Sequence, residues 1–463
     1  MNKATFSSPA EEIAQRRSAV RASPRNAQAH ALLGMALQKH GHYAEAVPVQ
    51  KRALALDPKL FALHGVMAAA QFETGDFQGA ADSYRRALAK QPHDAALQRG
   101  LSESLRLSGQ LDTAVDSALR AVELAPQDVE SLLALAQARH VASDFAAAAE
   151  AFRQVTELAP DHLGAWIDRG QAEHRARRYE DALRSFARAL ELDPDNVQAL
   201  SRQGLCLRDL RRHDAAEAAL RRALELEPGN AAHWCELGVT LQQMSRALDA
   251  RPLFERSLEL DPDRVPTLFS LTHHYFEAGR WEDALRTVRR TMALAPSATA
   301  HSTLLFILSH ATLDGEELRR EHFAFGEQWE TPLRAGWKPH ANDRDPARKV
   351  RVGFVSADLR HHAVTRFVEP IFGMLCHSEQ LEFYVYSNSH EEDAVTGRLR
   401  TYMPNWRSIA GESDERAQEM IRADAIDILV DLSGHSAANR LPLFARKPAP
   451  LQASWIGYPG TTG

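Results

Sequence analysis

Cysteine, long apolar runs and a leader sequence are scarce or absent in this chain. Its three cysteines stand at positions 206, 235 and 376. They are too far apart in sequence for a disulfide framework or a metal-ligand spacing, so a reducing cytoplasm is expected. No apolar run approaches the roughly 20 residues that cross a bilayer. The opening MNKATFSSPAEEIAQRR lacks the apolar core of a signal peptide.

An excess of positive charge is also absent. The net charge is −6 and the isoelectric point is near 6.4. This balance leaves no electrostatic footprint for nucleic acid, so neither nucleic acid nor a membrane is expected as a partner. The apolar content of 44% and the charged content of 25% are those of a globular protein. A chain of 463 residues exceeds what one core normally holds, so two or more units are expected.

The first two thirds of the chain is an internal repeat. A proline recurs every 34 residues without insertion or deletion, at Pro24, Pro58, Pro92, Pro126, Pro160, Pro194, Pro228, Pro262 and Pro296. Alanine keeps the same period at Ala46, Ala80, Ala114, Ala148, Ala182, Ala216, Ala250 and Ala284. A third series of mostly small residues is Gly34, Ala68, Ser102, Ala136, Gly170, Gly204, Gly238 and Thr272. A 34-residue helix–turn–helix unit with these marks resembles the tetratricopeptide repeat.

The repeat marks have a physical reason. Small residues are expected where helices approach closely, and the proline ends each second helix because it cannot continue it. Bulky residues four positions after the alanine should fill the gaps between units, as at Phe152, Phe186, Leu220 and Phe254. Because one unit cannot bury its apolar face alone, stacked units should form an all-α superhelix whose concave face binds a protein. The alternative is an array that serves only as a spacer or dimer platform.

The strict period ends after Pro296, and the pattern then changes. Helical spacing continues to about residue 330, and proline, Asn, Asp and basic residues follow it to Lys349. We therefore predict an N-terminal cap helix in residues 1–26, eight repeats in 27–298, a helical transition and linker in 299–348, and an α/β lobe in 349–463.

The last part alternates strand-like and helical stretches. Strands are predicted at Val350–Val355, Leu381–Ser387, Ile426–Leu432 and Leu451–Gly457. Helices are predicted near 367–377, 394–404, 413–424 and 438–446. This alternation favours a parallel sheet with helical crossovers, a Rossmann-like lobe.

Titratable residues follow the first and third of these strands. His361 and His362 come soon after Val355, and Asp431 and His435 lie in DLSGH at the end of the third strand. Open α/β sheets bind ligands at the carboxyl ends of their strands, so these four residues are the candidate catalytic groups. On the residues alone, paired histidines in a loop are more often solvated than catalytic, and a strand-end Asp often only caps a helix.

Four stretches resemble the O-linked N-acetylglucosamine transferases and their SPINDLY-type relatives, glycosyltransferase family 41. They are HSTLLFILSH, VRVGFVSADLRHHAV, LEFYVYSN and DAIDILVDLSGHSAANRLPLFARKPAPLQASWIGYPGTTG. Repeats followed by such a domain match the family's order. The resemblance implies the first half of a GT-B fold of two facing lobes. The second lobe would follow residue 463, so we expect this sequence to hold an incomplete donor site.

The resemblance also implies an inverting transfer of a sugar from a nucleotide donor to Ser or Thr of a protein, with no metal. The implied donor is UDP-N-acetylglucosamine, and no further cofactor is expected. His362 matches the family's active-site histidine and is expected near the acceptor hydroxyl as general base or orienter. His361 is the alternative if the register slips by one. A tyrosine matches His435 in animal members, which weakens a catalytic role there.

The turn GYPGTTG offers the candidate donor-contact residues Gly457, Pro459, Gly460 and Thr461. It is equally consistent with a loop between lobes. Scattered histidines such as His273 and His274 lack acids at metal-ligand spacing, so no metal is predicted.

The asparagine ladder that lines the repeats of animal members is missing here. Its positions carry Leu32, Val66, Gly100, Ala134, Asp168, Arg202, Glu236 and Ser270. The identity of the acceptor therefore does not carry over from the family. A non-catalytic repeat scaffold with a truncated transferase lobe stays an alternative, as does an O-fucosyltransferase of the SPINDLY type.

Overall fold

The computed structural model describes residues 8–312 and 314–463. The chain forms two compact units, Met1–Gly229 and Asn230–Gly463. The division falls between two repeats, whereas the change of sequence pattern at 331–349 lies inside the second unit. The predicted domain boundaries stay a prediction. Among the helices of the described ranges, none has the length and apolar character that crossing a membrane requires.

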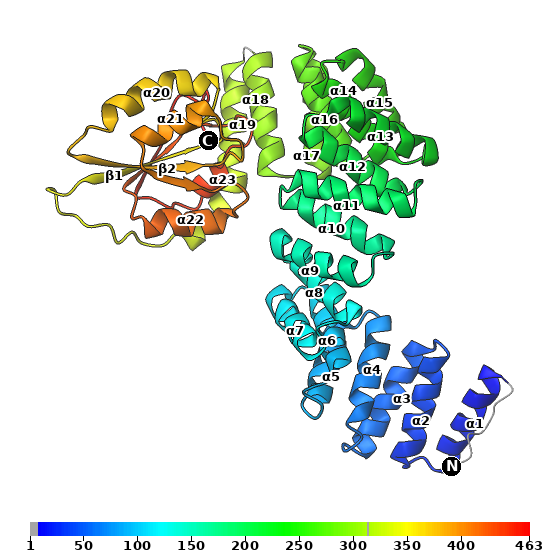
Figure 1. Ribbon diagram of the computed structural model, residues 1–463. Coiled ribbons are helices and arrows are strands. Elements are labelled where there is room, and N and C mark those ends of the chain that lie inside the picture. The colour runs from blue at the N-terminus through cyan, green and yellow to red at the C-terminus, as the bar shows by residue number, and fades with distance from the viewer. Residues whose placement is uncertain (1–7, 313) are drawn as a thin grey trace. The chain divides into compact units, whose positions relative to one another are not determined.

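Residues 8–229 of the first unit form antiparallel helix pairs, one pair to each repeat (Figure 1). The helices are α1 (Pro9–Ala22), α2 (Ala27–Lys39), α3 (Tyr43–Leu56), α4 (Ala62–Glu73), α5 (Phe77–Leu88), α6 (Ala95–Leu107), α7 (Leu111–Leu124), α8 (Val129–Val141), α9 (Phe145–Leu158), α10 (Leu163–Arg175), α11 (Tyr179–Leu192), α12 (Val197–Asp209) and α13 (His213–Leu226).

The periodic small residues lie where the prediction put them. Every marker alanine of this unit is fully buried, and Phe152, Phe186 and Leu220 fill the gaps beside them at 1% exposure or less. The small-residue series is needed for space, because a Cβ on Gly170 would lie 2.6 Å from the Phe186 ring. Close-packed interiors tolerate such an added group poorly.

The second unit begins with two more repeats and continues into a lobe. Its first helices are α14 (Ala231–Gln243), α15 (Ala247–Leu260), α16 (Val265–Glu277), α17 (Trp281–Leu294), α18 (Ala298–Ala311) and α19 (Gly315–Trp329), followed by a 3-10 turn, η1 (Thr331–Gly336). Residues 337–349 then lead into the lobe without regular structure. The transition predicted for 299–348 is thus helical in its first part.

The lobe is built on a parallel sheet of five strands, one more than predicted. The strands are β1 (Val350–Ser356), β2 (Leu381–Ser387), β3 (Asn405–Ser408), β4 (Ile428–Asp431) and β5 (Leu451–Ser454), in the order β3-β2-β1-β4-β5. The prediction missed β3 because this four-residue edge strand, NWRS, has two exposed residues and no alternating pattern. Its pairing with β2 is a tertiary contact that no local pattern indicates.

Helices cover both faces of this sheet (Figure 1). They are α20 (Ala363–Leu375), α21 (Ala394–Tyr402), α22 (Asp414–Ala423) and α23 (Leu441–Phe444). Helices α20 and α21 pack on one face with Val368, Phe372 and Leu399, and α22 and α23 pack on the other. The fold predicted from sequence, helical repeats followed by an α/β lobe, is confirmed.

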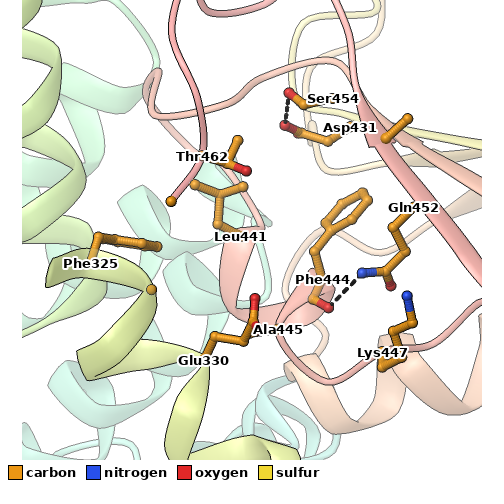
Figure 2. A pocket seen from close by; sticks show the side chains of 13 residues that line it. Phe325, Glu330, Asp431, Leu441, Phe444, Ala445, Lys447, Gln452, Ser454 and Thr462 are labelled. Carbon is orange, nitrogen blue, oxygen red and sulfur yellow. Dashed lines mark hydrogen bonds between the residues drawn. The ribbon is translucent and has the colours of Figure 1, made fainter. Parts of the chain in front are cut away.

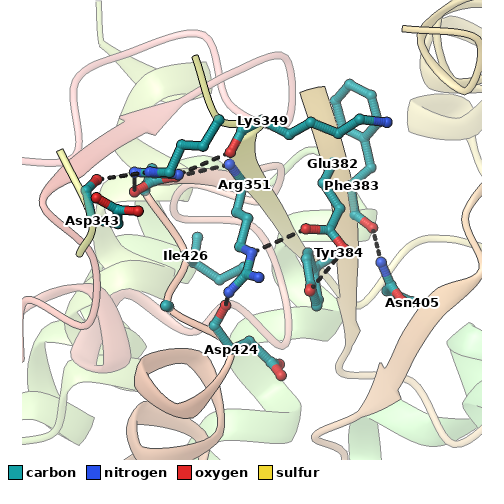
Figure 3. Close-up of polar contacts among 12 residues, drawn as sticks. Asp343, Lys349, Arg351, Glu382, Phe383, Tyr384, Asn405, Asp424 and Ile426 are labelled. Carbon is teal, nitrogen blue, oxygen red and sulfur yellow. Dashed lines mark hydrogen bonds and ion pairs between the residues drawn. The ribbon is translucent and has the colours of Figure 1, made fainter. Parts of the chain in front are cut away.

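A polar network closes the amino edge of the sheet. Asp427, 9% exposed, accepts hydrogen bonds from Arg348 at 2.6 and 2.7 Å, from Asn342 at 2.7 Å and from the Arg351 amide at 2.8 Å. Figure 3 shows Arg351 reaching both Glu382, at 3.0 Å, and the Asp424 carbonyl. Segment 337–349 is thereby tied to the edge opposite the candidate site.

Candidate functional site

The strand order places a topological switch point between β1 and β4. The chain runs from β1 outward through β2 and β3, then returns to the other side of β1 as β4. At such a point the loops that leave the carboxyl ends diverge and leave a crevice, where doubly wound sheets bind their ligands. The loops are 357–362 after β1 and 432–440 after β4. All four predicted catalytic residues lie at or just beyond these strand ends.

His362 is the N-cap of α20 and is exposed. Its Nδ1 accepts a hydrogen bond from the Val364 amide at 3.3 Å, and its own amide donates to Thr365 Oγ1 at 3.4 Å. This capping box satisfies amide groups that the first turn of a helix leaves free. Because Nδ1 is the acceptor, the neutral ring carries its proton on Nε2.

The protonated Nε2 faces Asp358, whose Oδ1 lies 3.9 Å away. Burial raises the pKa of Asp358, while His362 and then Arg360 oppose the rise. Sequence reasoning did not select Asp358 as a site residue. A signal was present, because an acid at a strand end stands four residues before the selected histidine.

His361 occupies a different position from its neighbour. Its side chain is exposed, and its amide donates to Asp393 Oδ2 at 2.7 Å. Asp393 also caps α21 by accepting from the Thr396 amide at 2.9 Å. Hydrogen bonds from the amides of Thr396 and His361 hold the pKa of Asp393 below its usual range. The backbone of His361 therefore anchors the loop, while the imidazole stays at the surface.

Asp431 ends β4 and is 2% exposed. Its carboxylate accepts from the amides of Ser433 at 3.0 Å and Gly434 at 2.8 Å, and from Ser454 Oγ at 2.9 Å. Burial raises the pKa of Asp431, and these three hydrogen bonds oppose the rise. The side chain shapes the loop after β4 and ties it to β5.

His435 lies in the interior at 1% exposure. Its Nδ1 is 3.0 Å from Ser302 Oγ on α18, and its ring centroid is 4.6 Å from that of Phe325 on α19. Tyr458 and His322 pack on the same ring, with centroids 5.2 and 5.3 Å away. Burial, with help from His322 and His301, lowers the pKa of His435 to about 3. His435 is thus a neutral packing group that joins the lobe to α18 and α19.

The residues around His435 were not selected from the sequence. Ser302 belongs to the stretch HSTLLFILSH that carried part of the family resemblance, but no local pattern placed it against His435. Tyr458 OH lies 3.0 Å from His322 Nε2 and 3.2 Å from the Leu305 carbonyl oxygen. Only the folded chain brings these segments together.

The predicted donor-contact turn folds over the loop after β4. A Cβ on Gly457 would lie 1.9 Å from the Leu432 carbonyl oxygen, so this position requires glycine. Gly460 packs beside Tyr458 and His322. Pro459 and Thr461 are exposed. Their contact with a donor stays a prediction.

A cavity of about 240 Å³ opens beside β5 (Figure 2). Polar groups of Glu330, Asp431, Lys447, Gln452 and Ser454 line it together with Phe325 and Phe444. Gly457, Pro459, Gly460 and Thr461 are not among the described residues that line it. Within residues 8–312 and 314–463, no group of three or more His, Cys, Asp or Glu side chains is arranged to hold a metal ion.

Comparison with known families matches the two parts of the chain separately. Residues 287–463 match the model of Glycosyl transferase family 41. Models of the Tetratricopeptide repeat match residues 27–60, 66–129, 133–197, 175–231, 201–265 and 241–305.

Curated relatives match over limited stretches. The probable UDP-N-acetylglucosamine–peptide N-acetylglucosaminyltransferase SPINDLY of Arabidopsis thaliana is 40% identical over 128 residues, 26% of this chain and 14% of that protein. The SEC protein of the same plant is 31% identical, covering 25% of this chain and 12% of the relative. The Caenorhabditis elegans UDP-N-acetylglucosamine–peptide N-acetylglucosaminyltransferase is 27% identical, covering 40% and 17%. The chain therefore aligns with less than a fifth of the length of these relatives.

Among solved structures, a Thermobaculum terrenum O-GlcNAc transferase mutant is 30% identical, with a TM-score of 0.42 over 64% of this chain and 50% of that one. The matched range 287–463 contains the sheet of the lobe and the loops after β1 and β4. Residues 287–463 thus match glycosyltransferase family 41, and residues that match tetratricopeptide repeats precede them.

Proposed function

We propose that this chain is part of a protein O-glycosyltransferase that moves N-acetylglucosamine from UDP-N-acetylglucosamine onto Ser or Thr of protein acceptors. The observation that carries the proposal is the family 41 match over residues 287–463, with its strand-end residues at a switch point of a parallel sheet. The named relatives are peptide N-acetylglucosaminyltransferases, which supports the same donor and acceptor class.

The reaction needs a positioned hydroxyl and a destination for its proton. The acceptor oxygen forms a bond to the anomeric carbon, and the bond from that carbon to the diphosphate oxygen breaks, with the electron pair leaving on the diphosphate. We assign His362 to orient the hydroxyl by donating from Nε2, because the helix cap occupies Nδ1. Asp358 takes the proton, since burial raises its pKa and makes the carboxylate a better base.

The remaining predicted residues support this pair. Asp431 holds the loop after β4, and His435 fixes that loop against α18 and α19. Both act as positioning residues because their side chains are 2% and 1% exposed. Gly457, Pro459, Gly460 and Thr461 stay proposed donor contacts, and Gly457 holds its turn against Leu432. The repeats are proposed to bind the protein acceptor without an asparagine ladder.

Transfer of labelled N-acetylglucosamine from its UDP form into protein tests the proposal, using the protein as its gene encodes it. His362→Ala removes cap and imidazole together, whereas His362→Asn keeps a good N-cap and removes only the imidazole. We expect both variants, and Asp358→Asn, to lose about 100-fold or more in rate, the range typical of a proton-transfer group. His361→Asn should retain most of the activity.

Distinct outcomes would contradict distinct parts of the proposal. Full activity of His362→Asn would reduce His362 to a helix cap. Transfer from GDP-fucose but not from UDP-N-acetylglucosamine would overturn the donor. No transfer from either donor by a folded protein would favour a repeat scaffold.

A further inference from the structure

A groove of about 500 Å³ lies between helices α3, α4 and α5, in the first two repeats. Lys51 on α3 and Arg86 on α5 line its walls. Leu54, Pro58 and Met67 add an apolar surface, and His64 lies among them. Three helices of two successive repeats therefore build one pocket that is both cationic and apolar.

The groove contains a packing position that is polar in the first three repeats, which carry His30, His64 and Gln98 there. His64 stands where five later repeats carry a larger or more apolar side chain, namely Leu132, Trp166, Leu200, Trp234 and Leu268. His64 is half-buried, and its Nδ1 is enclosed with no hydrogen-bond partner among the described residues. Burial and then Arg86 lower the pKa of His64, so the ring adds no charge at neutral pH. A polar, neutral side chain thus occupies a position that carries Leu or Trp in five later repeats.

Arg86 also lacks the ion-pair partner that four of its counterparts have, as do Arg52, which is followed by Ala55, and Arg290, which is followed by Ala293. In four later repeats the equivalent arginine contacts a glutamate three residues on, in the pairs Arg120–Glu123, Arg188–Glu191, Arg222–Glu225 and Arg256–Glu259 at 2.6–2.8 Å. The residue three positions after Arg86 is Ala89. Comparison with these four repeats therefore shows that Arg86 lacks a glutamate three residues on.

A second acidic partner of the arginine, an aspartate from the preceding repeat, is replaced by lysine in the case of Arg86. Arg222 contacts Asp195 of the preceding repeat at 2.7 Å, and Arg290 contacts Asp263 in the same way at 2.9 Å. The counterpart of these aspartates for Arg86 is Lys59. Where later repeats neutralise the arginine, this repeat adds a second positive charge.

We call Lys51, Lys59 and Arg86 the cationic face. All three side chains are exposed, and within the described part of the chain none of them forms an ion pair. The acid that lines the groove, Asp82, contacts Arg85 at 2.9 Å. This surplus occurs in a protein whose net charge is −6, so it is a local feature.

We propose that the cationic face and its groove bind an acidic peptide segment of a partner protein. Carboxylate or phosphate groups of that segment contact Lys51, Lys59 and Arg86, and a neighbouring apolar side chain packs against Leu54, Pro58 and Met67. The apolar lining favours a peptide over nucleic acid, whose regular phosphates need cations along a longer track. The site uses no residue of the lobe and does not depend on the proposed transfer activity.

Fluorescence anisotropy of the full chain with labelled peptides tests the proposal. The probes are a peptide of about ten residues of Glu and Leu, a version with phosphoserine in place of Glu, and a Lys–Leu peptide of equal length. The first two should bind, and raising salt from roughly 50 to 300 mM should weaken them markedly, because exposed charges are screened. Comparing the first two tells carboxylate from phosphate as the preferred anion.

The informative variant restores the acids and leaves every arginine in place. Lys59→Asp with Ala89→Glu gives Arg86 both partners found in later repeats, and binding should weaken roughly tenfold, since each exposed pair contributes a factor of a few. This variant changes the net charge by three, and so does the control His93→Asp with Gln127→Asp and Ala293→Glu, at the same repeat positions further along. The control should change affinity less than about twofold.

Equal weakening by the control would reduce the effect to net charge and overturn the site. Acidic peptides that do not bind at millimolar concentration would also overturn it. The proposal would also be overturned if both acidic peptides fail to bind while oligouridylate or phosphatidylglycerol vesicles do bind, and the Lys59→Asp, Ala89→Glu variant abolishes that binding. Circular dichroism of each variant shows that the helices are intact.

Discussion

The repeats are stabilised by contacts between residues close in sequence, whereas the lobe is stabilised by contacts between residues far apart in sequence. In the repeats, buried alanines and one large side chain per unit pack against neighbours one period away. In the lobe and at its contact with α18, polar contacts join distant positions, such as Asp427 to the Arg351 amide, 76 residues apart, and Ser302 to His435, 133 residues apart. A destabilising substitution in the repeats should therefore affect only the neighbouring helices, whereas one in the lobe should lower the stability of the whole lobe.

The largest local effect should follow Phe186→Ala. The ring is fully buried between repeats, so its loss should cost about 3–5 kcal/mol. Hydrogen exchange should rise in α10 and α11 while the lobe stays protected. Leu248→Ala is the control, because Leu248 is 93% exposed and should change stability by less than about 0.5 kcal/mol. Loss of protection in the lobe would contradict the local nature of repeat packing.

Asp427→Ala should show the opposite behaviour. It leaves Arg348 and Asn342 without their acceptor and should cost roughly 3 kcal/mol, because these partly buried donors share one buried carboxylate. Denaturant unfolding should shift for the whole lobe, including β1 and β4. Glu191→Ala, which breaks an exposed pair with Arg188 in a repeat, should cost less than about 1 kcal/mol. Exchange that rises only in segment 337–349 would show that Asp427 is a local tie.

Mild acid should destabilise the lobe before the first unit. Burial lowers the pKa of His435 to about 3, below its usual value near 6.5, so the unfolded state gains the proton first. The contribution of His435 to the free energy of unfolding is fully present above pH 6.5. Below that pH the free energy of unfolding falls by roughly 1.4 kcal/mol per pH unit, or about 2 kcal/mol at pH 5. His435→Asn should flatten this dependence in unfolding measured between pH 7 and pH 5. An unchanged slope would mean that His301 and His322 carry the effect.

Removal of a helix cap should give the smallest difference in stability loss between the repeats and the lobe. Asp94 accepts from the Leu97 amide at the start of α6, and Asp94→Ala should cost about 1 kcal/mol. Asp393 caps α21 and also accepts from the His361 amide, so Asp393→Ala should lower the melting temperature more than Asp94→Ala does. Thermal unfolding compares the two, and equal losses would mean that the contact to His361 adds nothing.

Sequence patterns located most of the lobe but not its weakest strand. The four predicted strands correspond to β1, β2, β4 and β5. The apolar residues of β1, β2 and β4 pack in the core of the lobe, whereas Leu451 and Ala453 of β5 are exposed. β3 was missed because the edge position leaves two of its residues in solvent. The helix after β1 begins at Ala363, earlier than predicted, since His362 caps it in a way that composition does not show.

The same limit applies to the candidate site. Strand ends identified His361, His362, Asp431 and His435 as a group, but not which of them is exposed. His362 is open and faces Asp358, whereas His435 is enclosed by Phe325, Tyr458 and His322. Exposure depends on what α18 and α19 contribute, and these helices precede the lobe by many residues.

The sequence by itself determined the repeats, their small-residue packing and the buried strands, because each is fixed by a short period or a local run of side chains. It also determined the loss of the acids around Arg86, which direct comparison of the repeats reveals. The tertiary structure decided the order of the strands, the pairing of Asp358 with His362 and the burial of His435. Those features depend on contacts between segments far apart in the chain, and no local pattern encodes such contacts.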